Sequence, residues 1–459
     1  MERRIVEKII DIAGSQNVLD SRADRECYVY DAGSVEGEVA DLIILPENSQ
    51  QISSIMSICH EEKIAVYPRG AGSGTAGGAV PAGKGGIVIS TARMNRILSI
   101  SVERLQAVVE PGVITGVLQA EVEKKGLFYP PDPASLSFCT IGGNVSTCAG
   151  GARAIKYGVT RDYVVSLELC LADGSIIKTS SGTAKDVAGY DLTRLVVGSE
   201  GTLGIVTKVV LKLLPLPEAT GTMAAFFKDM KSAVDSVGEV FRQQLLPRCA
   251  ELLDRNSIKC ISSVMPVGIP EHTDAMILFE VDGPQCHIEE QLSGIKQCCV
   301  ANDATGIVIC ESRKMSEDFW VARRSVSPAL KRLGFDRKIS EDICVPRDRL
   351  PEMISFLEDM EKEHGINITT FGHAGDGNLH VNIMYNENDI THEEIVSILN
   401  LVMQKTISLK GTISGEHGVG LAKLPFMELE FQKPVMEIMR HLKKAFDPHG
   451  ILNPGKKIQ

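Results

Sequence analysis

The sequence predicts an α+β protein of two domains. A length of 459 residues exceeds one typical domain, and a composition of 44% hydrophobic and 23% charged residues is that of a globular chain with real cores. The first part of the chain alternates short β-branched segments with glycine-rich turns, whereas longer amphipathic helices separate the strands of the second part. Pro215 and Pro217 end the last apolar strand of the first part, and we place the domain boundary there.

Local patterns locate the elements of the first part. A helix is predicted over residues 48–64 because Ile52, Ile55, Met56 and Cys59 recur at helical spacing, with Asn48 or the next serine as its cap. The other elements predicted here are strands at 64–67, 87–90, 106–110 and 204–214 and a helix near 115–125. In the second part we predict helices at 349–364 and 391–409 and strands at 275–281 and 306–310.

Charge and cysteine usage exclude several classes of protein. The 48 basic and 59 acidic residues give a net charge of -11, which does not suit a nucleic-acid-binding surface. The 12 cysteines form no C-x-x-C cluster, so no iron–sulfur or structural zinc module is expected, and they are interpreted as reduced thiols. The amino terminus lacks the apolar core of a signal peptide, and no run approaches the roughly 20 apolar residues of a membrane span. We therefore expect a cytoplasmic protein that is peripheral to the membrane at most through a partner.

Three glycine-rich clusters in the first part suggest one long ligand. Residues 68–78 contain five glycines directly after a strand, so their backbone N–H groups can form a nest for an anion such as a pyrophosphate. The run from Gly72 to Gly77 matches G-x-G-x-x-G, yet Pro81 and further glycines follow where a dinucleotide fold needs a helix. A flexible loop without a ligand is the alternative, and the clusters at 140–151 and 198–204 weigh against it.

These clusters resemble the flavin domain of the vanillyl-alcohol oxidase and p-cresol methylhydroxylase type. The resemblance rests on residues 68–78, 130–135, 141–144, 157–158 and 198–207. It implies a two-part FAD-binding domain, with the first loop on the pyrophosphate, residues 142–144 along the flavin and Ile205 near the adenosine side. FAD is expected to be non-covalent, because the first loop has no histidine of the kind that bonds the flavin in some members. The residues implied to hold FAD are Pro68, Arg69, Gly70, Ala71, Gly72, Ser73, Gly74, Pro131, Asp132, Ser135, Thr140, Gly142, Gly143, Asn144, Gly150, Tyr157, Gly158, Glu200, Gly201, Gly204, Ile205 and Asn453.

Two histidines in residues 371–382 predict a metal site. Asp376-Gly377 is a strong signal for a two-residue hairpin turn, which would place His373 directly opposite His380. Directly opposed strand residues have Cβ atoms roughly 4.5 to 5.5 Å apart, which suits two ligands of one divalent ion. Phe371 and Asn382 would share that face of the hairpin.

A second motif, residues 411–420, offers a third ligand in a frame of glycines. Glu416 would complete a His-His-Glu set, which suits zinc, iron or manganese. Neighbouring residues of an extended segment point apart, so His417 is expected to face the substrate as a base instead. A histidine in a surface loop is the alternative interpretation.

Both motifs resemble those of the flavin-linked D-2-hydroxyacid dehydrogenases, which include the flavoprotein subunit of glycolate oxidase, D-lactate dehydrogenases and D-2-hydroxyglutarate dehydrogenase. The resemblance covers nearly the whole chain. It implies that His373, His380 and Glu416 bind the metal, that His417 is the general base, and that Asn382 contacts substrate or flavin. It also marks Arg323 and Lys338 as binders of the substrate carboxylate. The charge pattern alone would make both of them solvated charges, since Arg323-Arg324 and Lys331-Arg332 are typical of a basic helix face. Residues 1–217 would form the FAD-binding domain, 218–410 the α+β substrate or cap domain with the metal site, and 411–459 a segment returning to the first domain.

The resemblance implies oxidation of a short D-2-hydroxy acid, D-lactate or glycolate, to the 2-keto acid with hydride transfer to flavin N5. Electrons would leave through a partner such as an electron-transferring flavoprotein or an iron–sulfur subunit. D-2-hydroxyglutarate is the alternative substrate. An FAD-dependent enzyme of the ether-lipid synthase type and a non-catalytic electron-relay flavoprotein are the rival functions; the relay would need neither a metal nor a base.

Overall fold

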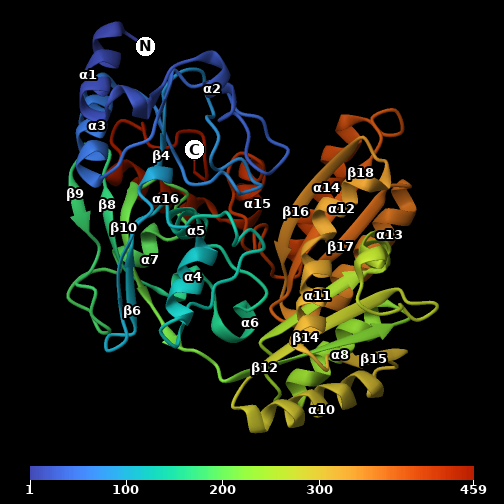
Figure 1. Cartoon of the computed structure of the whole chain (residues 1–459). Helices are drawn as coiled ribbons and strands as arrows, with labels where there is room; N and C mark the ends of the chain where they lie inside the picture. The colour runs from blue at the N-terminus through green and yellow to red at the C-terminus, as the bar shows by residue number, and fades with distance from the viewer. Residues whose placement is uncertain (459) are drawn as a thin grey trace. The chain divides into compact units, whose positions relative to one another are not determined.

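The computed structural model describes residues 1–458 and divides into two compact units (Figure 1). The first unit comprises Met1–Gly150, Val159–Leu216 and the last segment from Glu416, and the second comprises Gly151–Gly158 and Pro217–Gly415. Within residues 1–458 we find no helix with the length and apolar character that crossing a membrane requires.

The first unit opens with a four-stranded sheet in the order β1-β2-β4-β3, in which β2, β4 and β3 run parallel. Its strands are β1 (Val18–Leu19), β2 (Leu42–Ile44), β3 (Val66–Arg69) and β4 (Ile87–Ser90). Helices α1 (Arg3–Ala13) and α3 (Ser49–Glu62) share a buried apolar core with this sheet. The predicted helix at 48–64 is confirmed, and Asn48 caps it by accepting a hydrogen bond from the Gln51 amide.

A five-stranded antiparallel sheet in the order β5-β6-β10-β8-β9 forms the rest of the first unit's framework. Its strands are β5 (Ile97–Ser101), β6 (Gln106–Val109), β8 (Val164–Cys170), β9 (Ile176–Lys178) and β10 (Ile205–Lys212), and β11 (Leu214–Pro215) pairs separately with β7 (Leu127–Phe128). The remaining helices are α2 (Arg22–Glu26), α4 (Thr115–Glu123), α5 (Ile141–Thr147), α7 (Leu192–Val196), α15 (Met427–Glu430) and α16 (Lys433–Phe446).

The last segment of the chain is part of the first unit's core. The Asn453 amide donates to the Val66 carbonyl at 2.7 Å, which extends the ladder beyond β3. The buried Glu200 carboxylate accepts hydrogen bonds from the amides of Val419 and Gly420 at 2.8 and 2.7 Å. These contacts fix the loop that follows His417 within the first unit.

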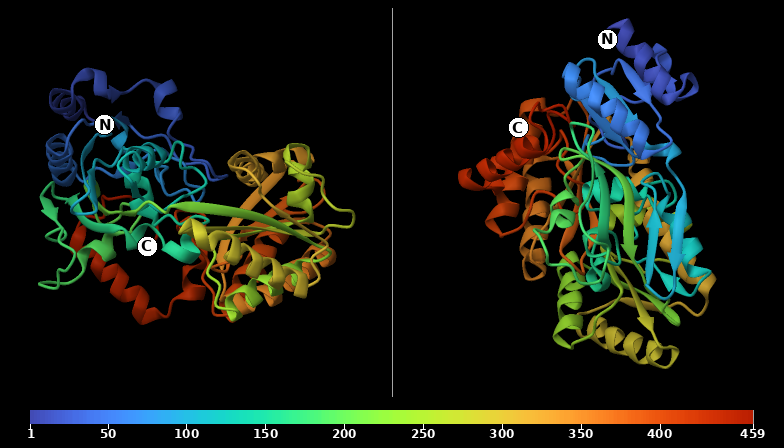
Figure 2. Two further views of the ribbon diagram at one scale, coloured as in Figure 1. Left: turned by 60° about the horizontal axis from the view of Figure 1, so that its bottom comes forward. Right: turned by 90° about the vertical axis from the view of Figure 1, so that its left-hand side faces the viewer.

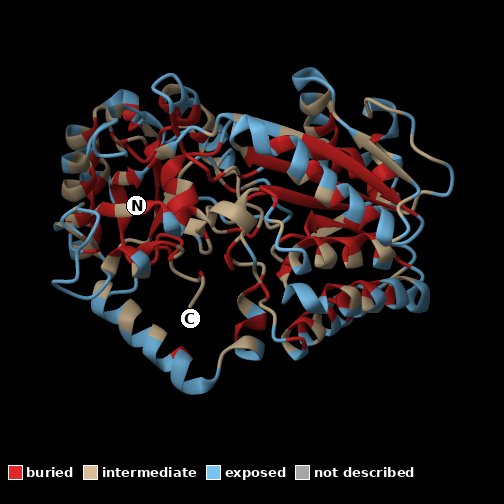
Figure 3. Cartoon of the chain, turned by 90° about the horizontal axis from the view of Figure 1, so that it is seen from below, coloured by how far each residue is buried: buried red, intermediate tan, exposed pale blue. Residues whose placement is uncertain are grey.

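The second unit is built on one seven-stranded antiparallel sheet in the order β15-β12-β14-β13-β17-β18-β16. Its strands are β12 (Ala219–Phe227), β13 (Cys249–Asp254), β14 (Ala275–Gly283), β15 (Gly306–Ile309), β16 (Arg337–Cys344), β17 (Asn367–His373) and β18 (Asn378–Tyr385). Most residues of β12, β13, β14, β17 and β18 are buried, while the helices around the sheet expose their outer sides (Figure 3). The two predicted strands, at 275–281 and 306–310, are confirmed as β14 and β15.

Helices cover both faces of this sheet (Figure 2). One layer contains α8 (Met230–Arg242), α10 (Gln285–Ala301), α13 (Leu350–His364) and α14 (His392–Ser408). On the other face, α9 (Arg255–Ile261), α11 (Arg313–Arg324) and α12 (Val326–Leu330) bury Phe319 and Ala322 against Leu278 and Phe371. The same face also carries polar side chains, and α11 contacts some of them, since Trp320 donates to Glu280 at 2.8 Å and Arg323 pairs with Glu251 at 2.7 Å.

Gly151–Gly158 differs from the sequence prediction, which placed it in the first domain. Its short helix α6 (Ala154–Tyr157) belongs to the second unit because its side chains bind Asp282 of β14. Lys156 forms an ion pair with the buried Asp282 carboxylate, and the Tyr157 hydroxyl donates to the same group at 2.7 Å. Arg248 lies 3.4 Å from Asp282 on the other side.

Replacing Asp282 by asparagine is expected to lower the free energy of unfolding by about 3 kcal/mol. The positive charges of Lys156 and Arg248 would then face a buried amide in place of a carboxylate. Urea unfolding of the holoprotein would measure the loss. Asp274→Asn, directly before β14, is the matched control, since Asp274 pairs with the largely exposed Arg255 and this pair should contribute less than about 1 kcal/mol. Equal losses in the two variants would contradict the assigned role of Asp282.

Candidate functional site

The first glycine-rich loop lies beside the start of α5 in the first unit. A side chain at Gly70 would come within 2.4 Å of the Thr140 hydroxyl, which caps α5 by accepting from the Gly143 amide. A side chain at Gly74 would meet nothing within 4 Å, so the far side of the loop faces open space. As predicted, no helix follows the third glycine before β4. The loop and the helix start together form a glycine-lined surface that fits an extended anionic ligand.

Several residues predicted to hold FAD also support this surface. The Arg69 guanidinium turns back under its own loop and donates to the Ala79 carbonyl at 3.2 Å. Asn144 donates to the Thr115 hydroxyl at 2.7 Å, and Asn453 donates to the Glu200 carbonyl at 2.7 Å. The other predicted FAD residues of the first unit are Pro68, Ala71, Gly72, Ser73, Pro131, Asp132, Ser135, Gly142, Gly150, Gly201, Gly204 and Ile205, whereas Tyr157 and Gly158 belong to the second unit.

The hairpin between β17 and β18 corrects the predicted register. His373 pairs with Asn378, and His380 pairs with Phe371, so the two histidines are not directly opposed. The predicted two-residue turn is wrong because residues 374–377 all lie outside the ladder. Val345 donates to the Gly377 carbonyl at 3.0 Å, and Gly377, at a φ of 90°, packs so closely on Val345 that only glycine fits. This attachment to the end of β16 requires the longer turn.

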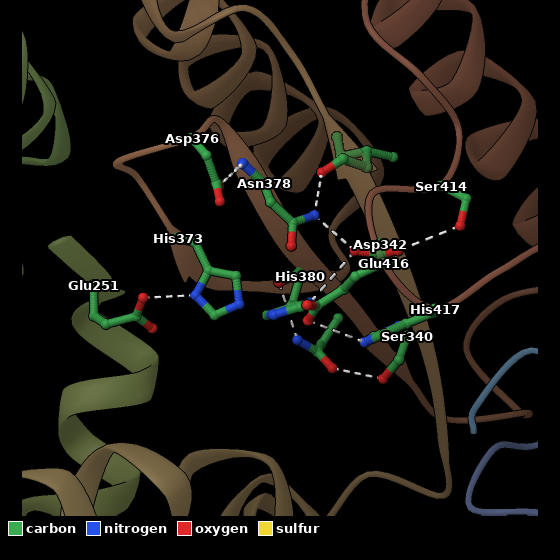
Figure 4. A network of polar contacts seen from close by, with 12 residues as sticks. Glu251, Ser340, Asp342, His373, Asp376, Asn378, His380, Ser414, Glu416 and His417 are labelled. Atoms are coloured by element: carbon green, nitrogen blue, oxygen red, sulfur yellow. Dashed lines mark hydrogen bonds and ion pairs between the residues drawn. The ribbon is translucent and has the colours of Figure 1, made fainter. Parts of the chain in front are cut away.

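The two imidazoles still meet on one face of the sheet. Both residues have the same parity in the ladder, and their ring centroids lie 5.3 Å apart in an edge-to-face arrangement (Figure 4). Nδ1 of His380 lies 3.8 Å from Asp342, its partner on β16, and Asn378 donates to Asp342 at 2.7 Å. The pair therefore remains suited to one divalent ion despite the changed register.

Arg323 is a buried member of this face and not part of a solvated basic surface. It is the penultimate residue of α11, and its side chain forms an ion pair with Glu251 of β13 at 2.7 Å. The guanidinium also lies over the Phe371 ring, 4.8 Å from its centroid. Arg324, the next residue along the helix, is exposed. The interpretation of both arginines as a solvated helix face is wrong for Arg323.

Lys338 and Asn382 lie on the same face, since Lys338, Ser340 and Asp342 alternate along β16 opposite Met384, Asn382 and His380. Burial, with a smaller contribution from nearby Lys331, lowers the pKa of Lys338. The Asn382 amide accepts from the Ser340 hydroxyl at 2.6 Å and donates to the Thr369 carbonyl at 3.2 Å. These bonds hold the Asn382 side chain in one orientation.

Glu416 and His417 follow Gly415 directly, and the division between the units falls inside this motif. Gly415 ends the second unit, where its amide donates to the Asp342 carbonyl at 3.3 Å. In the first unit, a side chain at Gly150 would come within 2.6 Å of the Glu416 carboxylate. The expectation that Glu416 and His417 point apart is wrong: this segment is a bend and not a strand, and Nε2 of His417 lies 3.9 Å from Glu416.

The sequence analysis missed Glu251, Asp342 and Ser340, although signals for them exist. Lys338, Ser340 and Asp342 alternate with apolar and acidic residues, which is the pattern of a polar strand face. Glu251 is a carboxylate flanked by the apolar residues Ala250 and Leu252 inside β13, and such a group requires a buried partner. The identity of those partners depends on strand order, which the local sequence does not specify.

Comparison with known proteins places this geometry in a family. Residues 216–457 match the family described as FAD linked oxidases, C-terminal domain, and residues 40–180 match the FAD binding domain. This chain belongs to the FAD-linked oxidases. It is an FAD-dependent oxidoreductase, and the predicted family is confirmed.

Curated relatives match over nearly their whole length. Glycolate oxidase subunit GlcD of Bacillus subtilis is 43% identical over 453 residues, which are 98% of this chain and 96% of the relative. D-lactate dehydrogenase of Anaerostipes hadrus is 32% identical, with 98% of this chain and 96% of the relative covered. GlcD of Escherichia coli K12 is 33% identical, with 91% and 83% covered.

Solved structures of low sequence identity confirm the predicted fold class. The structure of p-cresol methylhydroxylase with substrate bound has a TM-score of 0.81 at 16% identity and covers 99% of this chain and 96% of its own. Alkyldihydroxyacetonephosphate synthase has a TM-score of 0.78 at 18% identity, with 99% and 85% covered. At such identities the likeness shows the α+β fold of the vanillyl-alcohol oxidase type and not the reaction.

Proposed function

We propose that this protein oxidises a short D-2-hydroxy acid, D-lactate or glycolate, to the 2-keto acid and passes the electrons to a partner protein. One observation carries the proposal: a single face of the second unit's sheet presents two imidazoles, a buried guanidinium and a partly buried ammonium group. A metal-binding pair beside cations is the chemistry that recognises a small hydroxy acid. The names of the glycolate oxidase and D-lactate dehydrogenase relatives support the same substrate class.

The histidine pair fits a divalent ion such as zinc, iron or manganese. Nδ1 of each ring faces a carboxylate, at 2.6 Å for His373 and 3.8 Å for His380, which leaves Nε2 as the nitrogen suited to a metal. Glu416 is the proposed third ligand, and its direct attachment to Gly415 supports this role. Such an ion would polarise the substrate hydroxyl and make its proton easier to remove.

The protein side chains would then bind and orient the substrate. Arg323 would hold the substrate carboxylate through two parallel hydrogen bonds, with Lys338 adding a second positive charge. Asn382, fixed by Ser340 and Thr369, would contact the bound acid from the same sheet face. His417 would accept the proton of the hydroxyl group as the C2 hydrogen leaves with its electron pair. FAD, bound non-covalently by the first unit, would supply the acceptor for that hydride at N5.

Electron transfer to a separate protein is the second part of the proposal. The relatives named as subunits are parts of an assembly, and this chain has no C-x-x-C cluster for an iron–sulfur centre of its own. An electron-transferring flavoprotein or an iron–sulfur subunit would therefore reoxidise the flavin.

Anaerobic titration of the flavin spectrum tests the reaction. We expect glycolate or D-lactate to bleach the visible FAD band in the presence of a divalent metal, and chelation of the metal to abolish the bleaching. L-lactate is the matched control because only the configuration at C2 differs. Stronger bleaching by D-2-hydroxyglutarate would reassign the substrate to a longer acid. If none of these acids bleaches the flavin, the protein is an electron relay and the proposal is wrong.

A further inference from the structure

Glu251 contacts both His373, a proposed metal ligand, and Arg323, the proposed binder of the substrate carboxylate. Its side chain is 1% exposed and lies on β13, directly across the ladder from His373. One carboxylate oxygen, Oε1, lies 2.6 Å from Nδ1 of His373 (Figure 4). The other, Oε2, accepts from Nε and Nη2 of Arg323 at 2.9 and 2.7 Å.

The contact with Glu251 determines which ring nitrogen of His373 carries a proton. Oε2 of Glu251 accepts two hydrogen bonds from the Arg323 guanidinium, and such a charged donor favours the ionised carboxylate. An ionised carboxylate only accepts hydrogen bonds, so Nδ1 of His373 must be the donor. The lone pair of the ring is then on Nε2, and that tautomer can bind a metal through Nε2.

The same carboxylate determines which edge of Arg323 is used. Glu251 occupies the edge formed by Nε and Nη2, and Phe371 covers one face of the guanidinium. The edge formed by Nη1 and Nη2 keeps N–H groups pointing away from Glu251, and two of them suit a carboxylate. Arg323 is thereby held for end-on binding of a substrate.

We propose that Glu251 is a positioning residue that sets both the ring tautomer of His373 and the orientation of Arg323. This inference rests on the proposed function in that His373 is taken as a metal ligand and Arg323 as the substrate clamp. The two effects come from one side chain, so they should be lost together.

Glu251→Gln tests the inference, because an amide has one accepting oxygen and one donating nitrogen. If the amide oxygen faces Arg323, the NH2 group faces Nδ1 of His373 and favours the tautomer with the proton on Nε2. In the other orientation the NH2 group faces the guanidinium, and two groups that can only donate then meet. We expect the dissociation constants of Mn²⁺ and Zn²⁺, measured separately by calorimetry on the FAD-loaded protein, to rise about 10- to 100-fold. The KM for the hydroxy acid should also rise, while FAD content stays unchanged.

Asp254→Asn is the matched control. This half-buried carboxylate lies on the same strand and also accepts from two sides, at the amides of Ser257 and Thr370, but it does not contact His373 or Arg323. We expect its metal affinity to equal that of the unmodified protein. If Glu251→Gln also retains full metal affinity, or if both variants lose it equally, the inference is overturned.

A measurement on the unmodified protein covers the case in which Glu251→Gln does not fold. Nitrogen NMR of labelled histidine, assigned with His373→Gln, should show a protonated Nδ1 and an unprotonated Nε2 at His373 before metal is added. The opposite tautomer would overturn the inference. Failure of the protein to bind Mn²⁺ or Zn²⁺ would instead count against the proposed metal site, and the tautomer would still report on Glu251.

Discussion

Replacing His417 by glutamine is expected to slow reduction of the bound FAD by a hydroxy acid about 10²- to 10⁴-fold, the usual contribution of a general base. Glutamine is similar in size and can hydrogen-bond, but it cannot take up the proton of the substrate hydroxyl at neutral pH. The loop should keep its shape, since Glu200 holds the next residues through the amides of Val419 and Gly420. Anaerobic stopped-flow absorbance would give the rate of flavin reduction, and the visible spectrum would give the FAD content.

His441→Gln provides the control for the loss of an imidazole from the same unit. His441 lies on the exposed side of α16, and its replacement should leave the reduction rate unchanged. An unchanged rate in His417→Gln would remove that residue from the role of base. Loss of FAD from His417→Gln would show that the substitution disturbs the cofactor site and not proton transfer.

Local sequence patterns predicted the elements that depend on local physics. The helix α3 begins where Asn48 can cap it, and β4 matches the β-branched run 87–90 residue for residue. The absence of a helix after the first glycine loop also followed from Pro81 and the glycines beyond it. These features need information from only a few neighbouring residues.

The hairpin register shows where local reasoning ended. Asp376-Gly377 carries a strong two-residue turn signal, but the contact of Gly377 with Val345 of the segment after β16 requires a longer turn. Because a shift by two residues preserves which face each side chain occupies, His373 and His380 still meet. The prediction that the two histidines share one face is confirmed, and the predicted pairing of the two is wrong.

Long-range contacts explain what the sequence left undetermined. Glu251 and Arg323 lie 72 residues apart in the chain, and only the order of the strands and the packing of α11 bring them together. The placement of α6 in the second unit likewise depends on Asp282, 125 residues beyond Tyr157. No local pattern encodes such pairs, whereas an isolated acid within an apolar strand at least indicates that a partner exists.

Replacing Arg323 by methionine is expected to lower kcat/KM for the hydroxy acid about 30- to 700-fold, which corresponds to about 2 to 4 kcal/mol for a buried charge-assisted contact. Methionine keeps the aliphatic volume beside Phe371 but removes both the substrate clamp and the cation that faces Glu251. The free energy of unfolding should therefore fall as well, by about 3 kcal/mol. Steady-state kinetics with an artificial electron acceptor and urea unfolding would measure the two effects.

Arg323→Lys separates these two effects. Lysine keeps a positive charge for Glu251, so stability should be largely retained, but it lacks the planar fork that binds a carboxylate through two hydrogen bonds, so kcat/KM should still fall. Arg324→Met is the matched control: the same substitution at the adjacent exposed residue of α11 should change neither quantity. If Arg323→Met loses stability but keeps its kcat/KM, Arg323 is a structural partner of Glu251, and the substrate carboxylate must be bound elsewhere on the sheet face, with Lys338 the next residue to test.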